Sequence, residues 1–88
     1  MSAHLVWIDL EMTGLNPEHD RIIEMATIIT AGDLTVIAEG PVLAIRQEQA
    51  LLDGMDEWNQ THHSASGLLD RIAVSYTHLR AHETLPYL

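Results

Sequence analysis

Two acidic residues near the start of the chain, Asp9 and Glu11, are separated by a single leucine. They follow residues 5–8, an apolar run (LVWI) without a turn former, which predicts a buried central strand. In a strand, residues two apart point to the same face and lie about 6.6 Å apart along the axis. Two carboxylates on one face repel each other and lose hydration, so a purely structural strand gains nothing from them. Divalent cations remove this cost, because carboxylate oxygens at such a spacing can hold Mg²⁺ or Mn²⁺ between them.

Thr13, Gly14 and Leu15 follow one residue later and predict a tight exit from this strand. Glycine tolerates backbone conformations closed to other residues, so the main chain can approach a ligand closely at this point. An Asp-x-Glu pair followed by Met-Thr-Gly-Leu resembles the first motif of the DEDD-type 3′-to-5′ exonucleases. A bare Asp-x-Glu pair is weak evidence, whereas the nine-residue string WIDLEMTGL is specific.

The resemblance extends from about residue 5 to about residue 72. It includes the string WIDLEMTGLNPEHDRIIEMATIIT and the later segments AEGP, MDEWN and HxASGL. Within the family it is closest to the branch that acts on short oligoribonucleotides. It implies an α/β fold of the ribonuclease H-like exonuclease type, truncated here to an N-terminal three-stranded antiparallel meander and the first helices. The family acts as a homodimer, which we do not carry over to so short a chain.

Two-metal-ion hydrolysis of phosphodiester bonds is the chemistry that the resemblance implies. Two divalent ions, Mg²⁺ or Mn²⁺, roughly 3.5–4 Å apart, activate a water molecule and neutralise charge at phosphorus. Asp9 would bridge both ions, and Glu11 would hold one of them, so both residues are expected to be catalytic and metal-binding. Two further Asp ligands and a His general base are implied from motifs outside this region. His62, His63, His78 and His82 do not match the context of that base.

Substrate-binding residues are implied by the same resemblance: Thr13, Gly14, Leu15, Trp58 and His63. Leu15 and Trp58 would form a wedge and a platform around the terminal bases, where stacking contributes about 1–3 kcal/mol per base. His63 would contact the terminal ribose hydroxyl, the group that distinguishes RNA from DNA. The expected substrate is a short single-stranded oligoribonucleotide, degraded from its 3′ end to mononucleotides.

Each of these assignments has a plainer alternative. The acidic pair of the first strand could be a solvated strand end. Leu15 and Trp58 are by default core residues, and His63 is by default a surface histidine. Glu24 is expected to be a structural hydrogen-bond partner. At the level of function, the alternatives are another DEDD-type exonuclease acting on DNA or longer RNA, and a non-catalytic fragment that binds a metal or nucleotide.

Composition and charge narrow the substrate further. The chain has 88 residues, enough for one domain at most, and its 47% hydrophobic content favours a globular piece over disorder. Its formal net charge is −9, with four Arg and no Lys. A protein that holds long nucleic acid normally presents a basic face, so the acidity favours a very short substrate or indicates that the basic residues lie in a part of the protein missing from this sequence. Without cysteine, a signal segment or a membrane-length apolar run, the expectation is a cytoplasmic protein that does not enter membranes.

The elements that must position these residues are predicted as three strands and two helices. The strands cover residues 5–12, 21–30 and 34–45, the last interrupted near Gly40 and Pro41, with turns at 16–20 and 31–33. A short helix is expected over residues 48–55, then a junction over 56–59. Ser64 or Ser66 is expected to cap the last helix.

Residues 74–88 do not continue the resemblance. The segment VSYTHLRAHET resembles the in-frame translation of a transposase-type sequencing adapter. We therefore expect residues 1–73 to be the N-terminal part of an exonuclease domain and residues 74–88 to be a non-native tail that is left out of fold reasoning.

Overall fold

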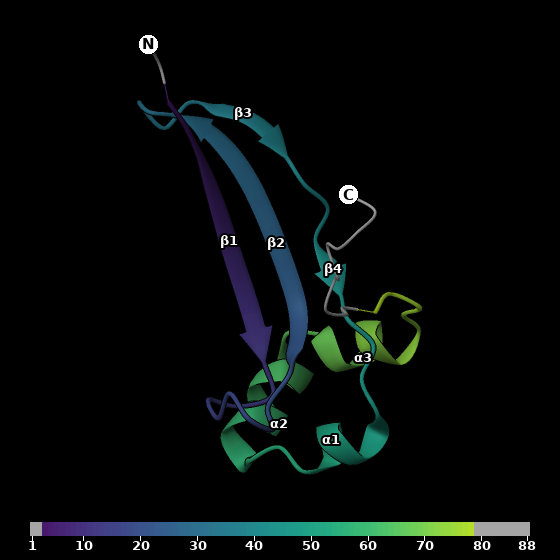
Figure 1. The fold of residues 1–88 in the computed structure, drawn as a ribbon. Coiled ribbons are helices and arrows are strands. Elements are labelled where there is room, and N and C mark those ends of the chain that lie inside the picture. Colours follow the sequence, from purple (N-terminus) through teal and green to yellow (C-terminus); the bar gives the residue numbers. More distant parts are fainter. Residues whose placement is uncertain (1–2, 79–88) are drawn as a thin grey trace, which may run out of the picture.

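The computed structural model describes residues 3–78 of the 88-residue chain. Its sheet contains β1 (His4–Met12), β2 (Ile22–Ala31), β3 (Val36–Glu39) and β4 (Leu43–Ala44). Three short helices follow, α1 (Gln49–Asp53), α2 (Glu57–Ala65) and α3 (Leu68–Ala73). Figure 1 shows β1 and β2 as two long strands side by side, with the helices gathered at one end of the sheet. An antiparallel meander followed by short helices is the arrangement that the sequence predicted.

The β1–β2 hairpin sets which residues share a face. Asp9 pairs with Ala26, and Glu11 pairs with Glu24, in an antiparallel register that shifts between Glu11 and Met12. Directly opposed residues of antiparallel strands have their side chains on the same face. Asp9, Glu11 and Glu24 therefore lie on one face of the sheet, as the i, i+2 spacing predicted for the first two.

The third predicted strand is divided into β3 and β4, which pair with successive stretches of β2. The break falls at Gly40 and Pro41, as predicted. The amide of Gly40 donates to the carbonyl oxygen of Thr27 at 2.8 Å. A side chain at this position would place its Cβ only 3.1 Å from that oxygen, so glycine allows the close approach.

The helix α2 was missed in the sequence, where residues 56–59 were expected to form a junction. Asp56 is its N-cap, and its carboxylate accepts a hydrogen bond from the amide of Asn59 at 2.7 Å. The helix is largely polar and buries only His63, so it lacks the apolar stripe that identifies most helices. The aspartate in the capping position was the available signal.

The predicted serine cap of the last helix was wrong. The N-cap of α3 is Gly67, which lies in the left-handed region at φ 80° and makes no side-chain capping bond. Ser66 instead ends α2, and its hydroxyl donates to the carbonyl oxygen of His63 at 3.1 Å. Because only two residues separate the helices, the chain reverses through a glycine and leaves no room for a separate serine cap.

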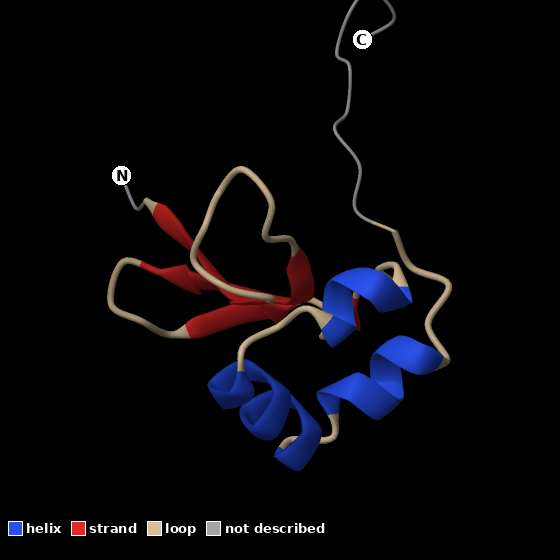
Figure 2. Cartoon of the chain, turned by 90° about the horizontal axis from the view of Figure 1, so that it is seen from below, coloured by secondary structure: helices blue, strands red, loops and turns tan. Residues whose placement is uncertain are grey.

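The hydrophobic core lies where the helices meet the end of the sheet, as the view in Figure 2 shows for the elements. It consists of Ile23, Leu52, Met55, Leu68 and Ile72, with Ala44 and Leu69 packed against it. Residues of α1 and α3 and Met55, which lies between α1 and α2, contribute to this cluster, so these helices are tied to the end of the sheet that carries the acidic pair. No helix among residues 3–78 is long and apolar enough to cross a membrane.

The prediction that residues 5–8 form a buried central strand was wrong for this chain. Val6 is 62% exposed and Ile8 is 57% exposed. β1 pairs only with β2 among the described residues, so it is an edge strand here. Its apolar composition suits a strand with neighbours on both sides, and residues 3–78 supply a neighbour on one side only.

The predicted tail begins within the described part of the chain and continues beyond it. Ser75 donates its hydroxyl hydrogen to the carbonyl oxygen of Ala44 at 2.6 Å, and the amide of Arg46 donates to the carbonyl oxygen of Thr77 at 2.7 Å. Residues 79–88 lie outside the described residues. The assignment of residues 74–88 as adapter-derived stays a prediction.

Candidate functional site

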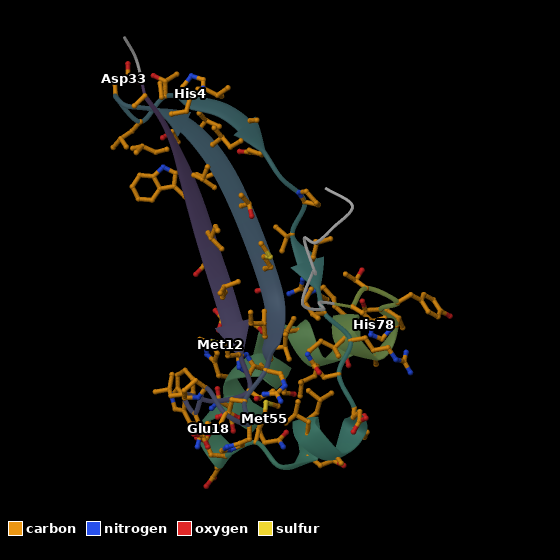
Figure 3. The ribbon with its side chains drawn as sticks, viewed as in Figure 1. His4, Met12, Glu18, Asp33, Met55 and His78 are labelled. Carbon is orange, nitrogen blue, oxygen red and sulfur yellow. The ribbon has the colours of Figure 1, made fainter. Side chains whose placement is uncertain are left out.

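The acidic pair lies near the end of β1 that faces the helices. Asp9 is exposed and Glu11 is half-buried. Within residues 3–78, neither carboxylate has a hydrogen-bond or ion-pair partner. Figure 3 labels Met12 at the end of β1 near the helices and His4 at the opposite end of the strand. Both carboxylates are therefore open to a ligand from solvent.

A third carboxylate, that of Glu24, lies on the same face of the sheet but is paired with an arginine. Glu24, directly opposite Glu11, forms an ion pair with Arg71 of α3. The sequence predicted a structural partner role for Glu24, and this contact confirms it. The guanidinium neutralises Glu24, so the charge that remains for a cation on this face is that of Asp9 and Glu11.

The loop between β1 and β2 is organised by Asp20. The hydroxyl of Thr13 donates to one carboxylate oxygen at 2.8 Å, and the amide of Asn16 donates to the other at 2.9 Å. The Asn16 amide, followed by the Thr13 hydroxyl, holds the pKa of Asp20 below its usual value. Thr13 is buried and also accepts a hydrogen bond from the amide of Arg21 at 3.0 Å. Its side chain therefore fixes the loop.

Gly14 is required by the same carboxylate. A Cβ added at Gly14 would lie 2.5 Å from Oδ2 of Asp20 and 2.8 Å from its Cγ. No side chain fits there unless Asp20 gives up its hydrogen bonds. Glycine is therefore needed for a close approach within the protein, in addition to the approach to a ligand that the sequence suggested.

An open pocket of about 490 Å³ joins the acidic strand to α2. It is lined by Glu11, Met12, Gly14, Leu15, Asp56, Trp58 and Asn59. Leu15 is 92% exposed and Trp58 is 66% exposed, so the plain reading of both as core residues was wrong. Four of the residues proposed from the sequence thus line this pocket, namely Glu11, Gly14, Leu15 and Trp58. Asp9, Thr13 and His63 do not line it.

His63 is almost fully buried, with 1% of its surface exposed, so the default reading as a surface histidine was wrong. Its Nε2 lies 3.1 Å from the carbonyl oxygen of Met12. A carbonyl can only accept, so Nε2 carries the proton in this contact. The imidazole therefore attaches α2 to the end of β1, directly beside the acidic pair.

His62 was considered in the sequence only as a mismatch to the family's general base. In the structure its ring stacks on Trp58, with the centroids 4.6 Å apart and 13° between the planes. It also approaches the acidic strand: one ligand atom each from Glu11, His62 and His63 lie within 4.8 Å of one another. The spacing of Trp58 and His62, four residues apart on one helix, was the signal available in the sequence.

A second hollow, of about 510 Å³, lies between α1 and the end of α3. It is lined by Arg46, Gln47, Glu48, Gln49, Leu52, Ile72, Ala73 and His78. None of the residues proposed from the sequence as catalytic or substrate-binding takes part in it. The acidic pair and the pocket beside Trp58 therefore define the candidate site.

Residues 6–81 match the RNase_T family, whose members are described as exonucleases. Since this match covers most of the 88 residues, the chain belongs to this exonuclease family. The similarity to individual proteins is more specific. The chain is 68% identical over 72 residues to the oligoribonuclease of Alcanivorax borkumensis, covering 82% of this chain and 40% of that protein. These matches confirm the resemblance that the first motif indicated.

Two further relatives carry the same name. The chain is 59% identical over 87 residues to the oligoribonuclease of Pectobacterium atrosepticum, covering 97% of this chain and 48% of that protein. It is 60% identical over 72 residues to the oligoribonuclease of Coxiella burnetii, covering 82% of this chain and 39% of that protein. The chain therefore spans less than half the length of these curated relatives.

Proposed function

We propose that the whole protein is a 3′-to-5′ exoribonuclease that degrades short oligoribonucleotides to mononucleotides in the cytoplasm. In this proposal, the present chain carries the first metal-binding motif and part of the substrate pocket. The observation that carries it is the unpartnered Asp9–Glu11 pair on one face of β1, next to a hollow bordered by Leu15 and Trp58. The family membership and the similarity to oligoribonucleases support the same reaction.

The donor set of the acidic pair fits Mg²⁺ or Mn²⁺. Both ions prefer oxygen ligands, and each carboxylate can hold one or bridge two ions. When bound, such ions activate water, neutralise charge at phosphorus and assist the departing 3′-oxygen. The hairpin fixes the two carboxylates on a common face, and the Arg71–Glu24 pair keeps a third carboxylate from competing with them.

The pocket beside Glu11 is suited to the 3′-terminal nucleotides. Leu15 and Trp58 present large apolar surfaces to solvent, and bases stack on such surfaces with about 1–3 kcal/mol each. His63 would reach the terminal ribose through Nδ1, because Nε2 is engaged by Met12. Thr13 and Gly14 would act through the loop that they shape around Asp20.

The acidity of the chain supports a short substrate within this proposal. A net charge of −9 opposes a long polyanion, while a dinucleotide brings few phosphates to the site. An exonuclease acting on DNA or longer RNA is the first alternative. It would cleave a deoxyribose terminus or a long strand as readily as a short ribonucleotide.

A non-catalytic role is the second alternative, and it applies to the isolated 88-residue chain. The family resemblance implies two more Asp ligands and a His base, and the chain spans only 39–48% of the relatives compared above. With an incomplete ligand set, the chain would bind a divalent ion or a nucleotide without turning over substrate.

The test uses a labelled diribonucleotide with Mg²⁺, added to the whole protein and to the 88-residue chain. The whole protein should cleave it, and Asp9→Asn or Glu11→Gln should each lower the rate by roughly 10²–10³-fold, as removal of a charge-stabilising group does elsewhere. The isolated chain should be inactive. Full activity in both variants of the whole protein would contradict the proposal.

Matched substrates decide between the alternatives. A DNA dinucleotide and a long oligoribonucleotide, each with the same 3′ sequence, should both be cleaved more slowly than the diribonucleotide. Equal rates on all three substrates would favour a general exonuclease. Turnover by the isolated chain, abolished by Asp9→Asn, would contradict the inactive-fragment expectation.

A further inference from the structure

Two imidazoles and one carboxylate converge beside the acidic pair. Glu11 of β1 and His62 and His63 of α2 each offer a ligand atom, and these atoms lie within 4.8 Å of one another. Asp9 does not belong to this group, although it shares a face with Glu11. The cluster is therefore distinct in composition from the all-carboxylate pair.

His63 is held as a metal ligand is usually held. Its buried ring donates from Nε2 to the carbonyl oxygen of Met12, which leaves the lone pair of Nδ1 available. Histidine ligands of metal ions commonly donate their other ring nitrogen to a carbonyl or carboxylate, which fixes both the tautomer and the ring orientation. This histidine is therefore already in the tautomer that leaves one ring nitrogen free for a metal ion.

His62 is oriented by a different contact. Its exposed ring stacks on Trp58 and meets the ring of His63 edge-on, with centroids 5.2 Å apart and 67° between the planes. The stack limits the rotation of His62 without using a ring nitrogen. One nitrogen ligand is thus fixed by burial, while the second is held beside Trp58 and must turn away from it to reach the same point.

The donor set selects a class of ion. Two imidazoles with one carboxylate suit Zn²⁺ and similar transition ions, whereas Mg²⁺ binds oxygen ligands. We propose that Glu11, His62 and His63 form a binding site for Zn²⁺, which shares Glu11 with the Asp9–Glu11 pair proposed to hold Mg²⁺ or Mn²⁺. Three protein ligands leave a fourth tetrahedral position open to water.

The ligand atoms must move closer for this site to form. Bonds from Zn²⁺ to nitrogen and oxygen are about 2.0–2.2 Å long. Glu11 is half-buried and His62 is exposed, so both side chains have room to turn toward His63. Occupation of the site would withdraw Glu11 from the carboxylate pair and would alter the Trp58 stack, so Zn²⁺ bound here would oppose binding of the hard ions.

Isothermal titration of the 88-residue chain with ZnCl₂, and separately with MgCl₂, tests the site without any substrate. One Zn²⁺ should bind per chain, and His62→Gln or Glu11→Gln should each weaken it at least about tenfold, which corresponds to about 1.4 kcal/mol. Asp9→Asn is the matched control on the same face of β1. It should leave Zn²⁺ affinity within about twofold, on the same scale.

Two outcomes would overturn the proposal. Unchanged Zn²⁺ affinity in His62→Gln would remove that histidine from the site. Equal weakening by Asp9→Asn and Glu11→Gln would place Zn²⁺ on the carboxylate pair instead. Far-ultraviolet circular dichroism of each variant establishes that it folds, and Glu11→Gln provides a second test of the site if His62→Gln does not fold.

Tryptophan fluorescence adds a structural readout. In a Trp7→Phe background, emission reports on Trp58 alone, and Zn²⁺ should change it because His62 leaves the stack. No change at saturating Zn²⁺ would contradict the proposed geometry. Because no nuclease assay is involved, the Zn²⁺ site can fail while the nuclease proposal stands. Conversely, full nuclease activity of Asp9→Asn in the whole protein would count against the nuclease proposal and not against the Zn²⁺ site.

Discussion

Arg71 on α3 forms an ion pair with Glu24 on β2, the residue directly opposite Glu11 in the hairpin. Two glutamates placed directly across an antiparallel pair repel each other. The arginine removes this repulsion by neutralising the glutamate that does not line the pocket. One helix residue thus both fastens α3 to the sheet and leaves Glu11 as the available carboxylate.

A double-mutant cycle measures the strength of this pair. The Arg71 side chain is 45% exposed and that of Glu24 is 21% exposed, so solvent screens the attraction. Glu24→Gln and Arg71→Met should couple by about 0.2–1 kcal/mol in the free energy of unfolding, measured by urea denaturation. A coupling near zero would show that the pair contributes nothing measurable to stability.

Gly14→Ala should destabilise the loop between β1 and β2. The new methyl group would overlap the Asp20 carboxylate, which accepts hydrogen bonds from Thr13 and Asn16. Losing these bonds should cost about 1–3 kcal/mol in the free energy of unfolding. Gly32→Ala is the control, because its Cβ would meet only the carbonyl oxygen of Ala3, at 3.6 Å, and should change stability by less than about 0.5 kcal/mol. Equal effects of the two substitutions would contradict the steric explanation.

Acid should loosen the same loop. The pKa of Asp20 lies below its usual value of 3.8 in the folded chain because the Asn16 amide and the Thr13 hydroxyl favour the carboxylate. A lowered pKa stabilises the fold above the unfolded value, and this stability is lost as pH falls below 3.8 through the folded pKa. Asp20→Asn should therefore flatten the dependence of stability on pH in this acid range, measured by urea denaturation.

A second aspartate, Asp33, also contributes to the dependence of stability on pH. The pKa of Asp33 is also lowered, first by the amide of Thr35. Asp20→Asn should therefore remove only part of the acid dependence, and Asp33→Asn should remove another part. An unchanged profile in Asp20→Asn would show that the carboxylate interactions contribute little to folding.

Leu34 occupies a backbone conformation that disfavours a side chain. Its φ is 73°, in the left-handed region, and the side chain is 61% exposed. Non-glycine residues are disfavoured there by about 1–2 kcal/mol, and the exposed side chain recovers little of this by packing. Leu34→Gly should raise the free energy of unfolding by up to about 1 kcal/mol, while Val36→Gly in the adjoining strand should lower it. A loss of stability in Leu34→Gly would contradict the strain.

The open edge of β1 should cause self-association. Ile8 is 57% exposed on a strand paired only with β2 among residues 3–78, and such edges pair with other chains. Ile8→Lys should reduce association, measured by light scattering during concentration of the 88-residue chain. Val42→Lys is the matched control, because Val42 is 60% exposed and lies between β3 and β4. An equal reduction by both variants would point to net charge as the cause.

Local patterns in the sequence identified the parts of the fold that depend on local chemistry. The spacing of Asp9 and Glu11 gave their common face, and Gly40 with Pro41 gave the break between β3 and β4. The exposure of β1 could not be inferred in this way, because an apolar run has the same composition whether or not a neighbour covers it. Exposure depends on which other segments are present.

In the candidate site, too, local sequence patterns predict some features, while others depend on contacts between distant segments. Leu15 and Trp58 were proposed from resemblance, and their pocket is formed by contacts between β1 and α2 that no local pattern specifies. The default alternative for His63 was a surface histidine, yet it is buried and its ring reaches the carbonyl oxygen of Met12, fifty-one positions away in the chain. Such a contact depends on how the helix docks, which residue spacing alone does not determine.

The side of β1 that has no partner strand among residues 3–78 has a consequence for how copies of the chain meet. Along that side, the main-chain groups of the strand bearing Asp9 form a template for any extended peptide. The strand that carries the two acidic residues is thus also, within residues 3–78, the strand most open to pairing with a second copy of the chain.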